Sequence, residues 1–199
     1  MTIAGGASTV GADRKSATDA VIDADLDATY PRCVYKPNDD GERDVALPIN
    51  MHARVPGAKT AESVVSDAFT GLSNVRWTRI FPDSTAKAWD REEESLVAPT
   101  HSFRRPRLGD EWVHAHIWTV DEDRAAIHAH LDVLDLTASH FHRGEYYGDA
   151  ARQVTEQLLA DGWQEHTPYS IDYGLDDAQL EQWGETGDVK VAWPDSSEL

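Results

Sequence analysis

The chain has 199 residues and a formal net charge of −18, because 36 acidic residues outnumber 18 Lys and Arg residues. This length is enough for one domain with a substantial hydrophobic core. The charge argues against nucleic-acid binding, which needs clustered Lys and Arg, and no apolar run approaches the length of about 18 residues that a membrane span requires.

The acidic excess is spread along the whole chain and indicates a protein of a high-salt cytoplasm, such as that of a haloarchaeon or its virus. There, salt screens a dense acidic surface. An ordinary acidic protein with a basic partner is the alternative. The first residues lack the pattern of a signal peptide, so a cytoplasmic location is expected. Cys33 is the only cysteine, which excludes an internal disulfide.

Composition predicts one folded domain with two irregular ends. Residues 1–29 are rich in small and polar residues without periodicity and are expected to form a flexible arm. Residues 30–193 form the predicted domain, and residues 194–199 an acidic, frayed tail.

The elements expected before residue 110 follow from periodicity and turn residues. Thr60–Leu72 is the clearest helix, with apolar residues at three- and four-residue spacing and Thr60 as its N-cap. Ser84–Leu96 is expected to be a short acidic helix. The predicted strands are Tyr30–Tyr35, Leu47–Val55, Val75–Phe81 and Pro99–Leu108, and Lys36–Asp44 is predicted to be a loop.

The stretch Glu111–Asp135 predicts two strands joined by a short acidic turn. Side chains alternate faces along a strand, so the apolar residues of both strands can share one face only in one class of register. A two-residue turn would mix the faces. An odd-numbered loop, of three residues with a bulge, places Ala115 or Ile117 opposite Ala129.

This register brings four of the nine histidines onto the other face of the hairpin, which we call the histidine face. Its residues are His114, His116, Trp118, His128, His130 and Asp132. Directly opposite Cβ atoms lie roughly 5 Å apart, close enough for imidazoles to share an ion.

After the hairpin, residues 136–147 form an irregular connection, followed by a helix at Asp149–Asp161 with Asp149 as N-cap and Gly162 at its end. Trp163–Ile171 is expected to be a strand. A short helix at Leu175–Trp183 and a strand at Val189–Trp193 complete the chain. The order of elements favours an α+β two-layer sandwich, a mostly antiparallel sheet with helices packed on one face. The histidine face is then expected to be open to solvent.

Histidine is the commonest transition-metal ligand, and three or four imidazoles can hold zinc or another divalent transition metal. The candidate ligands are His114, His116, His128 and His130. Asp132 is a further ligand or a group that orients an imidazole. His140 and His142, on the following loop, are weaker candidates, and Glu122 and Glu145 are the nearest carboxylates for acid–base chemistry.

Two other interpretations of the histidine face are open. The imidazoles can simply decorate a solvated sheet face, and this is the interpretation that we favour on the sequence alone, because single His-x-His pairs are weak evidence. They can also contact an anionic or sugar-like small ligand beside Trp118. Convergence of imidazole nitrogens from both strands within about 4 Å would favour the metal, since ligand bonds are roughly 2.1 Å long.

One family resemblance is carried by short motifs. A strand, a helix, a Trp-containing strand and an Arg-rich segment precede the motif His114-Ala115-His116-Ile117-Trp118. The motif His128-Ala129-His130-Leu131-Asp132 follows, before a further helix. This order resembles the LssY C-terminal-type soluble domain over roughly residues 47–165. That domain, of uncertain function, is sometimes joined to membrane lipid-phosphatase-like domains. This chain has His-x-His where the family has adjacent histidines. The resemblance implies a free-standing accessory domain and assigns no catalytic residue.

Two functions are therefore expected from the sequence. The first is a small α+β protein that binds a transition metal or a small polar ligand, with hydrolysis as one use of the site. The second is a non-enzymatic accessory, structural or protein-interaction domain, including a virus- or plasmid-encoded assembly component. Whether the protein is an enzyme is left open.

Overall fold

The computed structural model describes residues 29–55, 60–71, 77–82, 84–106, 111–134, 142–183 and 188–194. The predicted arm and acidic tail lie outside the described residues, apart from Thr29 and Pro194.

The described residues form a strand-rich fold with short helices. The strands are β1 (Cys33–Pro37), β2 (Arg43–Pro48), β3 (Met51–Arg54), β4 (Thr78–Ile80), β5 (Ala88–Asp90), β6 (Ser95–Val97), β7 (His101–Pro106), β8 (Trp112–Thr119), β9 (Arg124–Leu134), β10 (His142–Glu145), β11 (Trp163–Ser170) and β12 (Asp188–Pro194). The helices are α2 (Ala61–Gly71), α3 (Tyr147–Ala160) and α4 (Asp177–Trp183).

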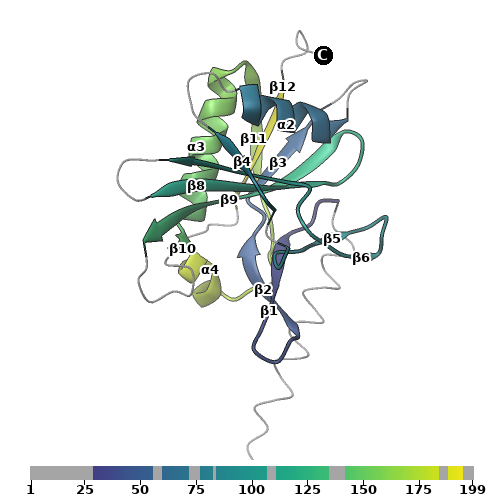
Figure 1. Cartoon of the computed structure of the whole chain (residues 1–199), viewed down its shortest axis with the longest axis vertical. Helices are drawn as coiled ribbons and strands as arrows, with labels where there is room; N and C mark the ends of the chain where they lie inside the picture. The colour runs from purple at the N-terminus through teal and green to yellow at the C-terminus, as the bar shows by residue number, and fades with distance from the viewer. Residues whose placement is uncertain are drawn as a thin grey trace, which may run out of the picture.

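One large sheet contains most of the strands, in the order β11-β12-β3-β9-β8-β7-β4, and β10 pairs with β9. The pairing of β12 with β3 is parallel, and the other pairings in this sheet are antiparallel. The predicted α+β fold with a mostly antiparallel sheet is therefore confirmed. Figure 1 shows β8 and β9 side by side across the middle of the molecule, with α2 on one side and the β1–β2 hairpin on the other.

The hairpin of β8 and β9 has the predicted register. Ala115 lies opposite Ala129, and the histidines pair as His114 with His130 and His116 with His128. The amide of Val120 donates to the carbonyl of Arg124 at 2.9 Å and closes a three-residue turn at 121–123. The odd loop length arises because only that register buries both apolar faces together.

The apolar face of the hairpin lies in the main hydrophobic core. Val65 and Phe69 of α2 and Val154 and Leu158 of α3 belong to the same buried cluster as the alternating apolar residues of β8 and β9. Full burial of one such side chain contributes about 1.5–3 kcal/mol. This cluster therefore holds the hairpin rigidly against the rest of the chain.

The histidine face is covered, so the expectation of an open, solvated face is wrong. His116 is 7% exposed, His130 8% and His128 0%. A second hydrophobic cluster lies on this face. Trp118 and Ala126 pack there with residues of β1, the β2–β3 connection, β5 and the segment just before β5, namely Val34, Ile49, Ala86 and Ala88. The small β1–β2 and β5–β6 sheets thus add a layer that sequence periodicity does not reveal.

Asn50 links β9 to its two partners on one edge. β3 pairs with β9 up to Ile127, and β10 pairs with it from Leu131 onward. Between them, the side chain of Asn50 donates to the carbonyl of Ala129 and accepts from its amide, each at 2.9 Å. The same amide group donates to the carbonyl of Tyr147, at the start of α3. Asn50 therefore satisfies the buried backbone groups of Ala129, which lies between the segments of β9 that pair with β3 and with β10.

The segment predicted as an acidic helix at Ser84–Leu96 is instead the β5–β6 hairpin, so that prediction is wrong. A carboxylate oxygen of Asp90 accepts from the amides of Glu92 and Glu93 and fixes the turn. Such local bonds offer the backbone an alternative to a helix. Buried Ala86 and Ala88 then alternate with more exposed neighbours, as in a strand.

Two further boundaries differ from prediction. The single strand expected at Leu47–Val55 is broken between β2 and β3, because the chain leaves β1 there and joins β9. The second helix begins at Tyr147, so Asp149 lies in its first turn and the N-cap is Tyr146, in the left-handed conformation at φ 52°. In α2, by contrast, Thr60 is the predicted cap and accepts from the amide of Ser63 at 3.3 Å.

Candidate metal site

Three histidines of the hairpin converge on one point. His114 and His116 come from β8 and His130 from β9, and one ring nitrogen of each lies within 4.8 Å of those of the other two. Strand alternation and the register described above place these side chains on one face. This group could hold a metal ion, because imidazole nitrogen is a preferred ligand of zinc and its neighbours in the transition series.

Asp132 joins two of the three histidines. One carboxylate oxygen lies 3.3 Å from Nε2 of His114, and the other lies 3.1 Å from Nε2 of His130. Two ligands that each lie roughly 2.1 Å from a tetrahedral ion are separated by about 3.4 Å. Each carboxylate oxygen therefore lies at about the ligand-to-ligand spacing from one ring nitrogen. The three imidazole nitrogens, within 4.8 Å of one another, are spaced more widely than the roughly 4 Å expected of a formed site, so they must approach one another by up to about 1.4 Å to bind one ion.

Two of the three histidines have a protein partner on Nδ1. Nδ1 of His116 lies 2.7 Å from the hydroxyl of Ser102 on β7. Nδ1 of His130 lies 3.0 Å from Nε2 of His128. Ligating histidines in metalloproteins are usually held in this way through their second nitrogen. These contacts fix the orientation of the His116 and His130 rings.

His128 is close to the three histidines but both of its nitrogens are engaged. Its Nδ1 lies 2.5 Å from the carbonyl oxygen of Pro48, and its Nε2 faces His130. Burial lowers the pKa of His128 well below 6.5, and the neighbouring His130 and His116 lower it further. His128 is therefore neutral at pH 7 and lies beneath the group of three rather than within it.

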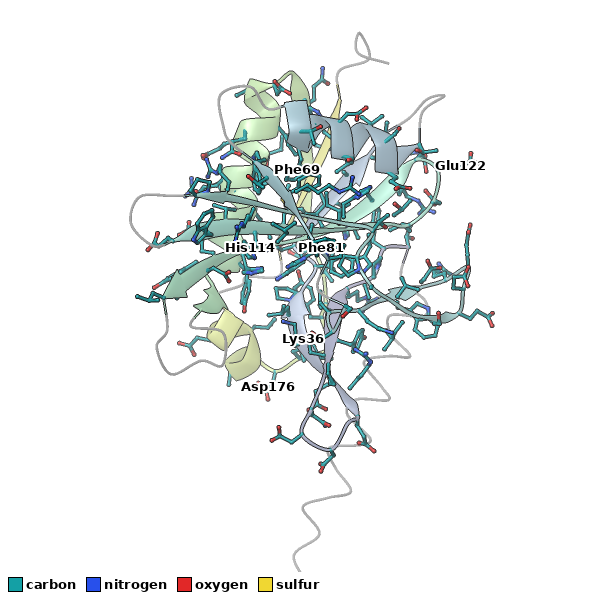
Figure 2. The ribbon with its side chains drawn as sticks, viewed as in Figure 1. Lys36, Phe69, Phe81, His114, Glu122 and Asp176 are labelled. Carbon is teal, nitrogen blue, oxygen red and sulfur yellow. The ribbon has the colours of Figure 1, made fainter. Side chains whose placement is uncertain are left out.

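The site reaches solvent on the side of His114 and Asp132, whose side chains are each 16% exposed. Figure 2 shows His114 at the outer part of β8, at the other end of the hairpin from Glu122 in the turn. An ion can therefore enter beside Asp132. Glu122 is too far along the strand to serve this point, because residues of a strand advance roughly 3.3 Å each.

The remaining predicted residues are placed as follows. His140 lies outside the described residues, and of His142 and Glu145 only the backbone, in β10, is described. Their predicted roles stay predictions. β10 does pair with β9 from Leu131 to Leu134, so the backbone of His142 lies beside the end of β9 that carries Asp132.

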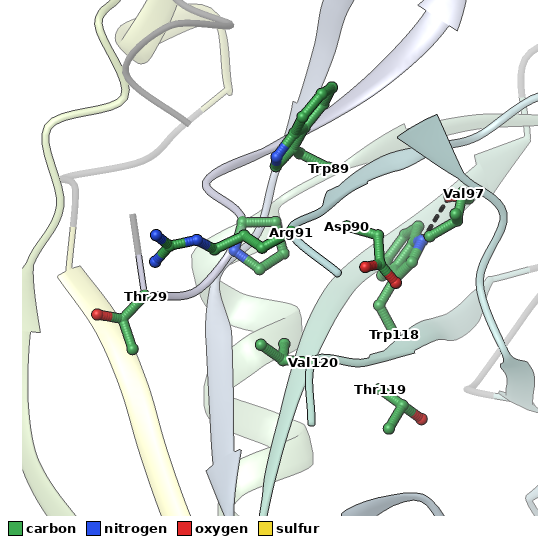
Figure 3. A pocket seen from close by; sticks show the side chains of 9 residues that line it. Thr29, Trp89, Asp90, Arg91, Val97, Trp118, Thr119 and Val120 are labelled. Carbon is green, nitrogen blue, oxygen red and sulfur yellow. Dashed lines mark hydrogen bonds between the residues drawn. The ribbon is translucent and has the colours of Figure 1, made fainter. Parts of the chain in front are cut away.

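Trp118 is 2% exposed and lies at the other end of the histidine face, where its indole Nε1 donates to the carbonyl of Val97 at 3.1 Å. Figure 3 shows it in the wall of a small pocket, together with Trp89, Asp90 and Arg91. The pocket has room for about one water molecule. In this conformation, a sugar-sized ligand beside Trp118 would need the pocket to widen.

Sequence reasoning missed the groups that orient the imidazoles. Ser102 and the Pro48 carbonyl lie 14 and 80 residues from the histidines that they contact. Only Ser102 left a signal, since it lies in the strand predicted before the hairpin, where it alternates with His101 and Phe103. No sequence pattern identifies a particular carbonyl as a hydrogen-bond partner.

No family model matches this chain, and no curated protein and no solved structure matches it significantly. The resemblance to the LssY C-terminal-type domain therefore stays a prediction. Within the described residues, no helix is long and apolar enough to span a membrane.

Proposed function

We propose that this protein binds a divalent transition-metal ion, zinc being the best fit, through His114, His116, His130 and Asp132. The observation that supports this most is the convergence of three imidazole nitrogens within 4.8 Å beside a carboxylate whose oxygens lie within 3.3 Å of two of the rings. Three nitrogens and one oxygen suit tetrahedral zinc. Cobalt(II) suits the same four ligands, and its absorption spectrum reports the coordination geometry.

The rigidity of the site supports the same proposal. The ligands lie on two strands whose opposite faces are buried in the main core, and Nδ1 of His116 and of His130 is hydrogen-bonded. A site preorganised in this way loses little conformational entropy when it binds an ion. Histidines that only decorate a solvated sheet face would hydrogen-bond to water and would not be held by buried protein groups.

The ligand count bears on how the ion would be used. Four protein ligands make a closed, structural zinc site, whereas three ligands and an open position are typical of catalytic zinc. Asp132 is on the solvent side, so it is the ligand that can yield its position to water or a polar substrate. Hydrolysis is accordingly the reaction class to test first, and a structural ion in an accessory domain is the alternative.

The competing explanation is a hydrogen-bonded network without metal, in which His114 and His130 hold Asp132. We expect isothermal titration in about 2 M KCl to show one Zn²⁺ per chain. His116→Ala should weaken binding at least ~100-fold, because it removes a ligand rather than a supporting group. His166→Ala, an exposed histidine on β11, is the matched control and should bind normally.

Elemental analysis of protein purified without chelator completes the test. Metal-free protein that takes up no Zn²⁺ or Co²⁺ and melts at the same temperature with and without them would refute the metal proposal, because an ion that binds only the folded state must raise the midpoint.

A further inference from the structure

His128 lies beneath the candidate metal site and is more deeply buried than any of the three converging histidines, with 0% exposure. Its two nitrogens bond two different groups, the carbonyl oxygen of Pro48 and Nδ1 of His130. It therefore connects the backbone at the end of β2 to one proposed ligand.

The chemistry of these contacts assigns the protons. A carbonyl oxygen only accepts, so Nδ1 of His128, at 2.5 Å from Pro48, carries a hydrogen. A fully buried ring beside a neutral carbonyl has no negative partner in these contacts to stabilise a charge, so it is neutral. Its Nε2 then has a lone pair and accepts.

The position of the hydrogen on His128 also determines the position of the hydrogen on His130. Because Nε2 of His128 accepts, Nδ1 of His130 donates across the 3.0 Å contact and carries a hydrogen. The lone pair of a neutral His130 is then on Nε2, the nitrogen that faces Asp132. Nε2 and the carboxylate oxygen, 3.1 Å apart, are both acceptors in that state, so a cation between them relieves their repulsion.

We propose that His128 is a positioning residue of the metal site: by donating to Pro48 and accepting from His130, it holds His130 in the tautomer that presents Nε2 to the ion. This inference rests on the proposed function. Supporting partners of this kind usually are carboxylates or carbonyls, and here an imidazole relays the effect of a carbonyl that cannot itself reach the ligand.

The first test reads the tautomers directly, by long-range ¹H–¹⁵N correlation spectra of the full chain with and without Zn²⁺. We expect His128 to carry its hydrogen on Nδ1 in both forms, and the zinc-loaded His130 to carry it on Nδ1 with Nε2 bound to metal. Hydrogen on Nε2 of His128, or zinc on Nδ1 of His130, would overturn the proposal.

The second test compares variants by Zn²⁺ titration. His128→Leu should weaken binding about 10–100-fold, the usual effect of losing an orienting partner. His128→Gln should stay within about fivefold of the wild type, because its amide offers a donor and an acceptor at nearly the spacing of the two imidazole nitrogens.

His52→Leu is the matched control, since His52 is equally buried on the adjacent strand and stacks on Tyr30 at 3.8 Å. It should lose stability yet bind Zn²⁺ within about twofold of the wild type, because the ring contact described for His52 is with Tyr30 and not with a proposed ligand.

The outcomes separate the two proposals. Wild-type protein that binds no Zn²⁺ refutes the proposed function and with it the role of His128. Wild-type protein that binds Zn²⁺, with His128→Leu equally tight or His128→Gln as weak as Leu, refutes only the positioning role. If His128→Leu does not fold, the tautomer spectra and the Gln variant still decide.

Discussion

His52 and His128 are single residues that link folding to pH. His52, on β3, is buried beneath the ring of Tyr30, and burial lowers its pKa from 6.5 to about 3. Burial lowers the pKa of His128 in the same direction. Both rings are therefore neutral in the folded chain at pH 7, while in the unfolded chain each takes up a proton near pH 6.5.

The sign of the resulting pH dependence follows from these values. Below pH 6.5 the unfolded state binds a proton at position 52 that the folded state does not, so the stability contributed by His52 is complete above pH 6.5 and decreases on acidification until about pH 3. The loss is about 1.4 kcal/mol per pH unit, or about 2 kcal/mol between pH 6.5 and 5.

We expect urea unfolding at constant salt to show this as a difference between two proteins. His52→Leu should lower stability at pH 7 yet have a shallower slope between pH 6.5 and 5 than the wild type, by up to about 1.4 kcal/mol per pH unit. Equal slopes for both would show that His52 is protonated in the folded chain.

At the scale of an element, the β5–β6 hairpin contains a residue in an unfavourable backbone conformation. Among the described non-glycine residues, positive φ occurs at Glu94, at 47°, and at Tyr146. Glu94 is exposed and closes the turn before Ser95 pairs with Asp90. A left-handed conformation costs an L-residue about 1–2 kcal/mol, which the rest of the hairpin must offset.

Glu94→Gly should therefore raise the free energy of unfolding by about 0.5–1 kcal/mol, because glycine adopts the left-handed conformation without a Cβ clash. Glu93→Gly is the control and should lower it by about 0.5 kcal/mol, since Glu93 is equally exposed but has no such strain to relieve. Thermal or urea unfolding of both variants measures this. A loss of stability in both would contradict the account.

At the scale of the whole molecule, the net charge of −18 is the property that we expect to control how stability depends on salt. Like charges on a folded surface repel one another, and the range of that repulsion decreases from about 10 Å at 0.1 M salt to about 3 Å at 1 M. We propose on this basis that the chain is adapted to a high-salt cytosol.

The melting temperature should accordingly rise by about 10 °C or more between 0.1 M and 2 M KCl. A variant with Asp39, Glu92 and Glu181, all exposed, each changed to Lys has a net charge of −12 and should show a smaller rise. A salt-independent midpoint, or the same rise in both proteins, would refute adaptation through charge.

The sequence by itself determined the features that depend on neighbouring residues along the chain. Alternation predicted the β8–β9 hairpin and its register, and three- and four-residue spacing with Thr60 as cap predicted α2. These patterns are strong because only one arrangement of each segment buries its apolar face.

Only the tertiary structure decided that the histidine face is covered and which histidines converge. The sequence named His114, His116 and His130 within a larger set, but the Pro48 carbonyl that engages His128, and the two small hairpins that cover the histidine face, belong to distant segments. Periodicity reports that one face of a strand is polar. Whether that face meets solvent, a second layer or an ion depends on contacts between residues far apart in the chain.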